Sequence, residues 1–231
     1  MPYNYTATLL LAAVLVAAIY VPTARAQLSW SGLRSGWGGA AGSGAQTTRS
    51  REVPENPPED NSPDVDLYPP PPASVPQGTC VCAFDFDGVL RAAPPGAADQ
   101  DTPAPEARMV VDACKAAGWA VAICSSNDSP AKMKMVLGQR LDPSTFTPQF
   151  FNSPAFQIKN DNKTPLLRNI IRYHQTLPQC VAFFDDRNWN KEYAAETGVL
   201  FIKTPTNKGI RYSDWLRAQQ VMTQYCDCVS R

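Results

Sequence analysis

The stretch Cys82-Ala-Phe-Asp85-Phe-Asp87-Gly88-Val-Leu-Arg91 decides the fold of this chain. An apolar run leads directly into two carboxylates at positions i and i+2, and a glycine follows. Alternate residues of an extended strand point to the same side, so Asp85 and Asp87 are predicted to face one small space where the strand ends. Because unpaired buried charge is costly, the pair indicates a site that holds a hard cation such as Mg2+ or a shared proton.

Composition limits the classes of function. The 231 residues suffice for one domain with a core, or for one domain plus appendages. There are 21 basic and 21 acidic residues and no block of like charge, so nothing indicates a nucleic-acid binder that neutralises phosphates. His174 is the one histidine, which argues against a histidine-rich zinc or copper site, and it is expected to be structural or exposed.

The first 78 residues are predicted to lie outside the folded domain. Residues 9–21 form an apolar run too short for a comfortable membrane span, and Ala24-Arg25-Ala26 is a small-x-small pattern, so 1–26 are interpreted as a signal peptide. An uncleaved signal anchor is the alternative, because no Lys or Arg precedes the run. Residues 27–78, rich in Gly, Ser and Pro, are predicted to form a disordered linker. The protein is therefore expected to be secreted or to stay in the secretory pathway, with membrane anchoring as the alternative.

Seven cysteines follow the leader, and in a secreted protein they are disulfide candidates. At least one bridge is expected between the Cys-x-Cys pairs at 80/82 and 226/228. The odd count leaves at least one thiol unpaired or intermolecular. Cys114 and Cys124 are expected to be ordinary buried thiols. A zinc site formed by the two pairs is a less favoured alternative, because Cys-x-Cys is not the usual zinc spacing.

Residues 79–231 are predicted to form one α/β domain. Strands are expected over 81–86, 119–124, 180–184 and 199–202, with a short strand near Phe150-Phe151, and helices over 105–117, 130–138, 164–174, 189–196 and 214–225. Several strands are continuous apolar runs, which is typical of a parallel sheet covered on both faces. The prediction is a Rossmann-like, three-layer α/β/α domain whose ligands bind beyond the carboxyl ends of the strands.

Polar residues follow three of the predicted strands and should share one rim: Asp85/Asp87, Ser125/Ser126 and Asp185/Asp186. Each residue has a simpler explanation when it is taken alone. Strand-end aspartates can cap helices, and Lys163 can be an ordinary surface lysine. The order and spacing of the whole set favour a single site.

Four motifs along residues 80–215 resemble those of the haloacid dehalogenase superfamily, and of its phosphatases in particular. They are Asp85-Phe-Asp87-Gly88-Val-Leu, Ser125 after the apolar run 121–124, Lys163 before a helix, and Phe183-Phe-Asp185-Asp186-x-x-x-Asn190. The magnesium-dependent phosphatase 1 type has a stretch similar to the last two. Asp87 is the second acid that phosphatases of this superfamily have and its dehalogenases lack, so phosphate-ester hydrolysis is expected.

The resemblance implies a role in catalysis or phosphate binding for four residues, one of which has an alternative. Asp85 is expected to attack phosphorus and form an aspartyl-phosphate. Asp87 is expected to protonate the leaving alcohol and then to deprotonate the attacking water. Ser125, with Ser126 as the alternative, is expected to bind a phosphoryl oxygen. Lys163 is expected to neutralise charge on the nucleophile and the phosphoryl group.

Mg2+ is the cofactor that the resemblance implies. Its expected ligands are the carboxylates of Asp85 and Asp186 and the backbone carbonyl of Asp87. Asp185 and Asn190 are expected to support the metal site. For the lysine role, Lys159 is the rival of Lys163, which is preferred because it directly precedes the Thr164-Pro165 helix start.

The spacing between the motifs leaves no room for a large cap domain, so the resemblance implies an open site. Such a site is expected to accept large phosphorylated substrates, for example phosphoproteins or polynucleotide ends, with small phosphometabolites as the alternative. The loop over residues 91–105 is a candidate flap.

The alternative function is a secreted binding or structural protein that has this fold without turnover. Two glycosylation sequons favour it, Asn127-Asp-Ser129 and Asn162-Lys-Thr164, since each lies beside a proposed site residue. The sequons go unused, or the site is blocked, or the organism does not glycosylate; the sequence leaves all three open.

Overall fold

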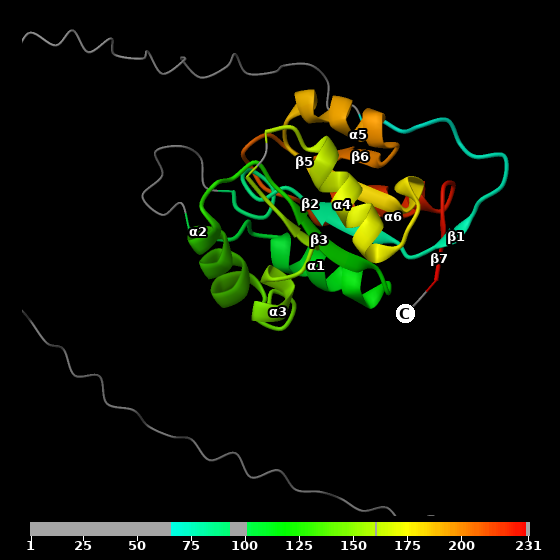
Figure 1. The fold of residues 1–231 in the computed structure, drawn as a ribbon. Helices are drawn as coiled ribbons and strands as arrows, with labels where there is room; N and C mark the ends of the chain where they lie inside the picture. The colour runs from blue at the N-terminus through cyan, green and yellow to red at the C-terminus, as the bar shows by residue number, and fades with distance from the viewer. Residues whose placement is uncertain (1–65, 93–100, 160, 230–231) are drawn as a thin grey trace, which may run out of the picture. The chain divides into compact units, whose positions relative to one another are not determined.

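The computed structural model describes residues 66–92, 101–159 and 161–229, which centre on a five-stranded parallel sheet (Figure 1). The strand order is β4-β3-β2-β5-β6, so the strand that leads to the paired acids is central. The strands are β2 (Val81–Phe84), β3 (Ala120–Cys124), β4 (Phe156–Gln157), β5 (Val181–Asp185) and β6 (Leu200–Lys203). All except β4 are predicted to within two residues at each end, because each is a short apolar run between polar or glycine-containing segments.

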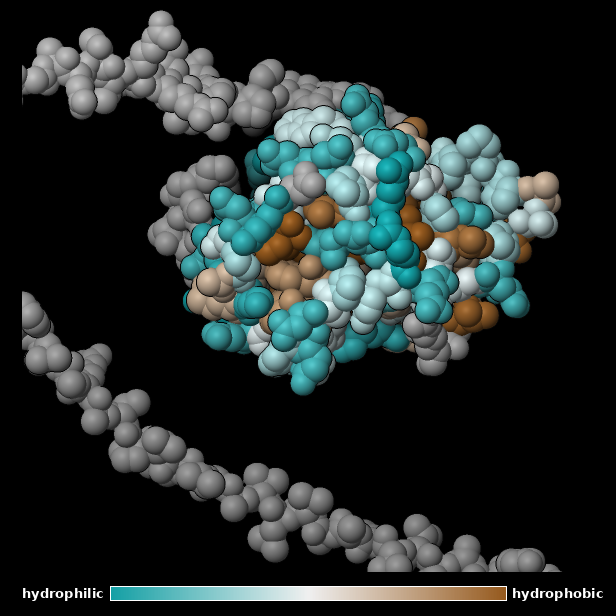
Figure 2. Space-filling model, viewed as in Figure 1, coloured by the Kyte–Doolittle hydropathy of each residue, from teal (hydrophilic) through white to brown (hydrophobic). Residues whose placement is uncertain are grey.

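Helices cover both faces of the sheet (Figure 1). Residues 82 and 84 of β2 pack in one core with α1 (Ala107–Ala116) and α6 (Tyr212–Met222). Residues 81 and 83 pack in the opposite core with α4 (Thr164–His174) and α5 (Lys191–Thr197). The predicted three-layer α/β/α architecture is therefore confirmed. On the face shown in Figure 2 the surface is largely hydrophilic, with smaller hydrophobic areas between.

Between β3 and α4 the chain forms α2 (Pro130–Met135), a π-helical continuation η1 (Val136–Leu141) and α3 (Pro148–Phe151). The short strand expected near Phe150-Phe151 is wrong, since these residues end α3. Thr147 caps this helix by accepting a hydrogen bond from the Phe150 N–H at 3.2 Å, and Pro148 occupies its first turn. The edge strand β4 follows this turn.

The remaining short elements are 3-10 turns and a terminal strand pair. The turns are η2 (Pro178–Cys180) and η3 (Asn188–Asn190), and the parallel pair is β1 (Gln77–Gly78) with β7 (Asp227–Cys228). The signal peptide, most of the linker and residues 93–100 of the candidate flap lie outside the described residues. In the described part of the chain, the helices are too short or too polar to cross a membrane.

Residues 66–78, predicted as the end of the linker, contact the domain. Leu67 forms an antiparallel bridge with Phe201 of the edge strand β6. Asp66 accepts a hydrogen bond from the Arg217 guanidinium at 2.6 Å, and the Tyr225 hydroxyl donates to the Pro69 carbonyl at 2.8 Å. An edge strand has unpaired backbone groups that a passing segment can pair with, which accounts for the difference from the prediction.

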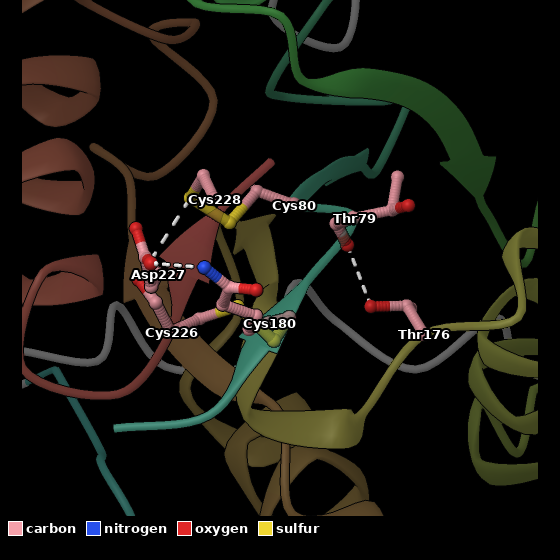
Figure 3. Close-up of a disulfide and its surroundings, with 8 residues drawn as sticks. Thr79, Cys80, Thr176, Cys180, Cys226, Asp227 and Cys228 are labelled. Atoms are coloured by element: carbon pink, nitrogen blue, oxygen red, sulfur yellow. Dashed lines mark hydrogen bonds between the residues drawn. A yellow bond between two sulfur atoms is a disulfide. The ribbon is translucent and has the colours of Figure 1, made fainter. Parts of the chain in front are cut away.

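Two neighbouring disulfides lie beside the β1–β7 pair and bind the C-terminal end to the rest of the domain (Figure 3). One joins Cys80 to Cys228 and the other joins Cys180 to Cys226. The expected bridge between the two Cys-x-Cys pairs is confirmed. The zinc alternative is contradicted, because a thiolate that has formed a disulfide is no longer a zinc ligand.

A third disulfide among the described residues joins Cys82 of β2 to Cys114 of α1. The expectation that Cys114 is a free thiol is wrong. Cys82 points to the face on which α1 packs, and this brings the two Cα atoms to 6.6 Å. Cys124 is a buried free thiol, as predicted.

Breaking the Cys80–Cys228 bridge should destabilise the fold. The bridge closes a loop of 148 residues, so its loss is expected to lower the free energy of unfolding by about 2–5 kcal/mol, chiefly by releasing the unfolded chain. The Cys80→Ala/Cys228→Ala protein is to be compared with wild type by urea denaturation. Cys124→Ala is the control, because it truncates a buried sulfur without opening a bridge. Equal stability of the double variant and wild type would contradict the structure.

The buried Asp142 carboxylate holds the loop after η1. It accepts hydrogen bonds from the Ser144 N–H at 3.0 Å, from the Lys115 ammonium at 3.2 Å and from the Thr145 hydroxyl. Burial alone would raise the pKa of Asp142, but these donors outweigh it and hold the pKa well below its usual range. The ionised form is therefore stabilised by folding.

Asp142→Asn is expected to lower the free energy of unfolding at pH 7 by about 1–3 kcal/mol. A depressed folded-state pKa contributes stability above the unfolded value, about 4, which is lost as the pH falls through the folded value. The difference between wild type and variant should accordingly shrink below about pH 4. Urea denaturation from pH 7 to 3 measures it, with the exposed Asp112→Asn as control. A difference independent of pH would contradict the explanation.

Candidate active site

The carboxyl ends of the sheet strands form the rim of a cleft of about 360 Å³. Asp85 follows β2, Ser125 follows β3, the aspartates 185 and 186 end or follow β5, and Lys163 directly precedes α4. The cleft walls include every predicted site residue except Asp185, which lies beneath Lys163. A second, more apolar cavity of about 260 Å³ lies beside residues 69–72, and the described residues in its walls include no Asp, Glu, Lys or Arg. The cleft at the rim is therefore the candidate site.

Lys163 is a buried lysine between two carboxylates. Its ammonium lies 2.9 Å from Asp85 Oδ2 and 2.6 Å from Asp185 Oδ2, and its side chain is 1% exposed. Burial would lower the pKa of Lys163, but Asp85 and Asp185 outweigh it and raise that pKa, so the lysine carries its positive charge. The surface-lysine explanation is wrong. The rival Lys159 is exposed and does not line the cleft.

Asp185 has partners on both of its oxygens. Oδ2 accepts hydrogen bonds from Lys163 and from Asn190 Nδ2 at 2.8 Å, and Oδ1 accepts one from the Arg187 N–H at 2.8 Å. These contacts fix the Lys163 ammonium beside Asp85. The structure thus places Asp185 between Lys163 and Asn190.

Asp186 has one oxygen that is satisfied and one that is not. Oδ2 accepts a hydrogen bond from the Asn207 N–H at 2.9 Å and lies 3.5 Å from the Arg187 guanidinium. Oδ1 is buried and has no hydrogen-bond partner among the described residues. Burial raises the pKa of Asp186 to about 6. A buried oxygen without a partner normally has a ligand or an ion to satisfy it.

The carboxylates of Asp85, Asp185 and Asp186 offer oxygens within 4.8 Å of one another. Burial raises the pKa of Asp85 to about 7, against the opposing attraction of Lys163. Three acids face two cations, Lys163 and Arg187, so the ionised cluster has one negative charge in excess. Closely spaced hard oxygens, excess negative charge and one unpartnered oxygen fit a small divalent cation, and Mg2+ prefers such oxygen ligands.

Gly88 allows Asp186 to approach the first motif. Its φ is +78°, and a Cβ at this position would lie 2.2 Å from Asp186 Oδ2. Neither the backbone conformation nor the space accepts a side chain. The glycine after the paired acids is therefore required by a carboxylate 98 positions away in the chain.

The side chain of Asp87 has partners on both oxygens. Oδ1 accepts hydrogen bonds from Arg91 Nε at 2.7 Å and from Arg91 Nη2, and Oδ2 accepts one from Asn127 Nδ2 at 2.6 Å. The buried Ser125 Oγ accepts a bond from the Asn127 N–H at 3.3 Å, while Ser126 is half-buried in the cleft wall. Asn127 thus links the first motif to the second.

Sequence reasoning missed several residues of this site. Arg91 and Arg187 each contact a site carboxylate, the Asn207 backbone binds Asp186, and the half-exposed Trp189 lines the cleft. From the sequence alone, Asn127 is distinguished only as part of a sequon. Its place two residues after Ser125 was the available signal, because the turn after a rim strand brings its polar residues to the cleft.

No protein-family model and no curated protein matches the chain. Among solved structures, it is similar to the N-terminal part of a Bacteroides fragilis protein that contains a phosphatase domain, complexed with Mg, at 17% identity and a TM-score of 0.45. The match covers 64% of this chain but only 41% of that one.

Two further solved structures show the same level of likeness. An uncharacterised Corynebacterium glutamicum protein matches at 12% identity and TM-score 0.41, over 65% of this chain and 99% of that one. A protein assigned as a 3-deoxy-D-manno-octulosonate 8-phosphate phosphatase from Vibrio cholerae matches at 15% and 0.39, over 66% and 76%. Because the TM-scores are below 0.5, the argument for function rests on the geometry of the cleft.

Proposed function

We propose that this chain is a Mg2+-dependent phosphomonoester hydrolase of the haloacid dehalogenase type that acts through an aspartyl-phosphate on Asp85. One observation carries the proposal. The buried Lys163 joins Asp85 and Asp185, and beside them Asp186 has a buried oxygen that no described residue bonds. This arrangement supplies a nucleophile, a fixed positive charge and a position for a cation within one cleft.

The chemistry takes two steps. In the first, an Asp85 oxygen bonds to phosphorus, the bond from phosphorus to the alcohol oxygen breaks, and Asp87 gives its proton to the departing oxygen. In the second, water bonds to phosphorus, Asp87 takes a proton from this water, and the bond from phosphorus to Asp85 breaks. Free Asp85 and inorganic phosphate result. Dividing hydrolysis in this way replaces one difficult displacement by two easier ones.

The neighbouring residues stabilise charge in both steps. Lys163, 2.9 Å from Asp85 Oδ2, balances negative charge on the nucleophile and the phosphoryl group. Ser125 donates its hydroxyl to a phosphoryl oxygen, with Ser126 as the alternative donor. Both serines line the cleft, and Ser125 is the more buried.

Asp85, Asp186 and the backbone carbonyl of Asp87 would hold Mg2+, and Asp185 and Asn190 would support them. When bound, Mg2+ would supply positive charge that offsets the negative charge of the carboxylates and of the phosphate. Asp185 fits a supporting role, because its oxygens already accept bonds from Lys163, the Arg187 N–H and Asn190.

The substrate we propose is a phosphomonoester carried on a large molecule, with small phosphometabolites as the alternative. The half-exposed Trp189 in the cleft wall supports this class. We propose a secreted or secretory-pathway location, since three disulfides among the described residues require an oxidising compartment to form. Membrane anchoring by residues 9–21 remains the alternative.

A second candidate is a binding protein without turnover. The observation that favours it is the position of Asn127, whose Nδ2 is the atom a sequon glycan would occupy. This atom lies 2.6 Å from Asp87 inside the cleft. A sugar there would stand where the substrate binds. Mass mapping of Asn127 in secreted protein separates the two candidates, because a glycan on this amide would block the cleft of the phosphatase.

The test of the proposed function is hydrolysis of p-nitrophenyl phosphate by the full chain with Mg2+, with EDTA, and with EDTA followed by excess Mg2+. Activity is expected with Mg2+, should be lost in EDTA and should return when Mg2+ is restored. An absence of activity on a panel of phosphomonoesters would favour the binding protein. Activity that is unaffected by EDTA would contradict the metal dependence.

A further inference from the structure

We infer that Arg91 and Asn127 are positioning residues that hold the Asp87 carboxylate in the orientation needed for proton transfer to the leaving group. The inference rests on the proposed function and extends it to two residues outside the four motifs. It begins from the contacts of Asp87. The Asp87 side chain is 40% exposed, and within the described residues three donors fix its rotamer: two guanidinium nitrogens of Arg91 and the amide of Asn127.

Arg91 and Asn127 each hydrogen-bond a different oxygen of the Asp87 carboxylate. Arg91 binds Oδ1 and Asn127 binds Oδ2. Rotation about either side-chain bond of Asp87 would break at least one of these contacts. Hydrogen bonds to an ionised carboxylate are stronger than those between neutral groups, so they hold even a partly exposed side chain. The ionised form is the one that Asp87 has after it protonates the leaving group and before it takes a proton from water.

Contacts other than the one with Asp87 also hold Arg91 in place. Its side chain is 13% exposed, and its guanidinium lies 5.6 Å from the centroid of the Phe86 ring. Its N–H donates to the Phe86 carbonyl at 2.9 Å, and its carbonyl accepts from the Gly88 N–H at 2.7 Å. The turn after β2 therefore folds back on itself. This places the guanidinium of Arg91 next to the carboxylate of Asp87, four residues earlier in the chain.

Asn127 is fixed in the same way from the neighbouring strand end. Its Oδ1 accepts a hydrogen bond from the Ser129 N–H at 2.7 Å, and its own N–H donates to Ser125 Oγ at 3.3 Å. The contact with Ser129 requires an acceptor and the contact with Asp87 requires a donor, so the orientation of the amide is determined. Asn127 thus forms hydrogen bonds with both Asp87, the proposed proton donor, and Ser125, the proposed phosphate-binding serine.

Positioning of this kind matters most when the leaving group is a poor one. An alkoxide must receive a proton as its bond to phosphorus breaks, whereas p-nitrophenolate leaves without one. A misplaced Asp87 should therefore slow the release of alcohols far more than the release of p-nitrophenol. A residue that merely stabilised the fold, or that bound the phosphate, would affect both substrates alike.

The experiment compares kcat/KM for glycerol 2-phosphate and p-nitrophenyl phosphate, since kcat/KM reports the phosphoryl-transfer step for both. For Arg91→Met we expect a loss of about 10- to 100-fold on glycerol 2-phosphate and of less than about 3-fold on p-nitrophenyl phosphate. Asn127→Ala should show the same selectivity. Asn127→Asp should lose more on glycerol 2-phosphate than Asn127→Ala, because its new carboxylate would face that of Asp87.

Arg168→Met is the matched control, because Arg168 forms an exposed ion pair with Glu196 and does not line the cleft. It should change neither kcat/KM value, and thermal melting should show that all variants are folded. An equal loss on both substrates, or no loss, in Arg91→Met would overturn the inference while leaving the phosphatase intact. An absence of Mg2+-dependent hydrolysis by the wild-type chain would overturn the proposed function and this inference with it.

Discussion

Asp85→Asn is expected to lower kcat for phosphomonoester hydrolysis by about 10³-fold or more, because the amide cannot form the covalent phosphoryl intermediate. The fold should not be weakened by the same change. Burial raises the pKa of Asp85 to about 7, well above its ordinary value, so the ionised carboxylate is less stable in the folded protein than in the unfolded chain. Replacing it with a neutral isostere removes this penalty. The urea midpoint at pH 8 should be equal to or above that of wild type.

Two measurements check this expectation, steady-state hydrolysis of p-nitrophenyl phosphate and urea denaturation. Asp112→Asn is the matched control, since it makes the same chemical change in an exposed ion pair on α1. The control should keep wild-type activity. Turnover by Asp85→Asn at the wild-type rate would show that Asp85 is not the nucleophile. A large loss of stability would show that the ion pair of Asp85 with Lys163 is chiefly structural.

Gly88→Ala is expected to lower kcat by about 10²-fold or more. A Cβ at Gly88 would lie 2.2 Å from Asp186 Oδ2, so the proposed metal ligand must move, and a displacement of about 1 Å can cost 10²-fold in rate. The Mg2+ concentration that gives half-maximal activity should rise in the same variant. Both effects follow from one contact between the first and fourth motifs.

Gly198→Ala is the control for backbone strain. Gly198 has φ +81°, close to the +78° of Gly88, but among the described residues its Cβ would contact just Pro178 Cβ, at an ordinary 3.4 Å. Each substitution is therefore expected to lower the free energy of unfolding by about 1–2 kcal/mol, because alanine disfavours the left-handed conformation. Of the two, Gly88→Ala is the one that also crowds the cleft. Titration of activity with Mg2+ distinguishes the two variants. If both lost stability alike and neither lost activity, the account of Asp186 would be wrong.

Much of the fold could be predicted from local sequence. The four long strands are uninterrupted apolar runs, and the helix at Thr164 has proline in its first turn. The elements that were missed depend on tertiary contacts. Leu67 pairs with β6 because the sheet edge offers backbone groups, and Cys114 forms a bridge because α1 packs over Cys82. Neither partner is near in sequence.

The candidate site likewise has residues that the sequence predicts and residues that it does not. The motif residues could be predicted because several chemically distinctive residue types follow apolar strands in a fixed order. Arg91 and Asn127 could not, because arginine and asparagine are common in turns and only the folded chain brings both to Asp87. Asn207 acts through its backbone N–H, which any residue except proline would supply, so its identity gives no signal.

The formation of a phosphorylated Asp85 is the central claim, and chemical trapping tests it most directly. The Asp87→Asn variant, in which the second step is slowed, is mixed with p-nitrophenyl phosphate and Mg2+, quenched in acid and reduced with borohydride, which converts an acyl phosphate of aspartate into homoserine. Peptide mass spectrometry should find homoserine at position 85 only when substrate was present, and never in a variant that also has Asp85→Asn. Mg2+-dependent release of p-nitrophenol with position 85 unmodified, or with another carboxylate reduced in its place, would contradict the mechanism.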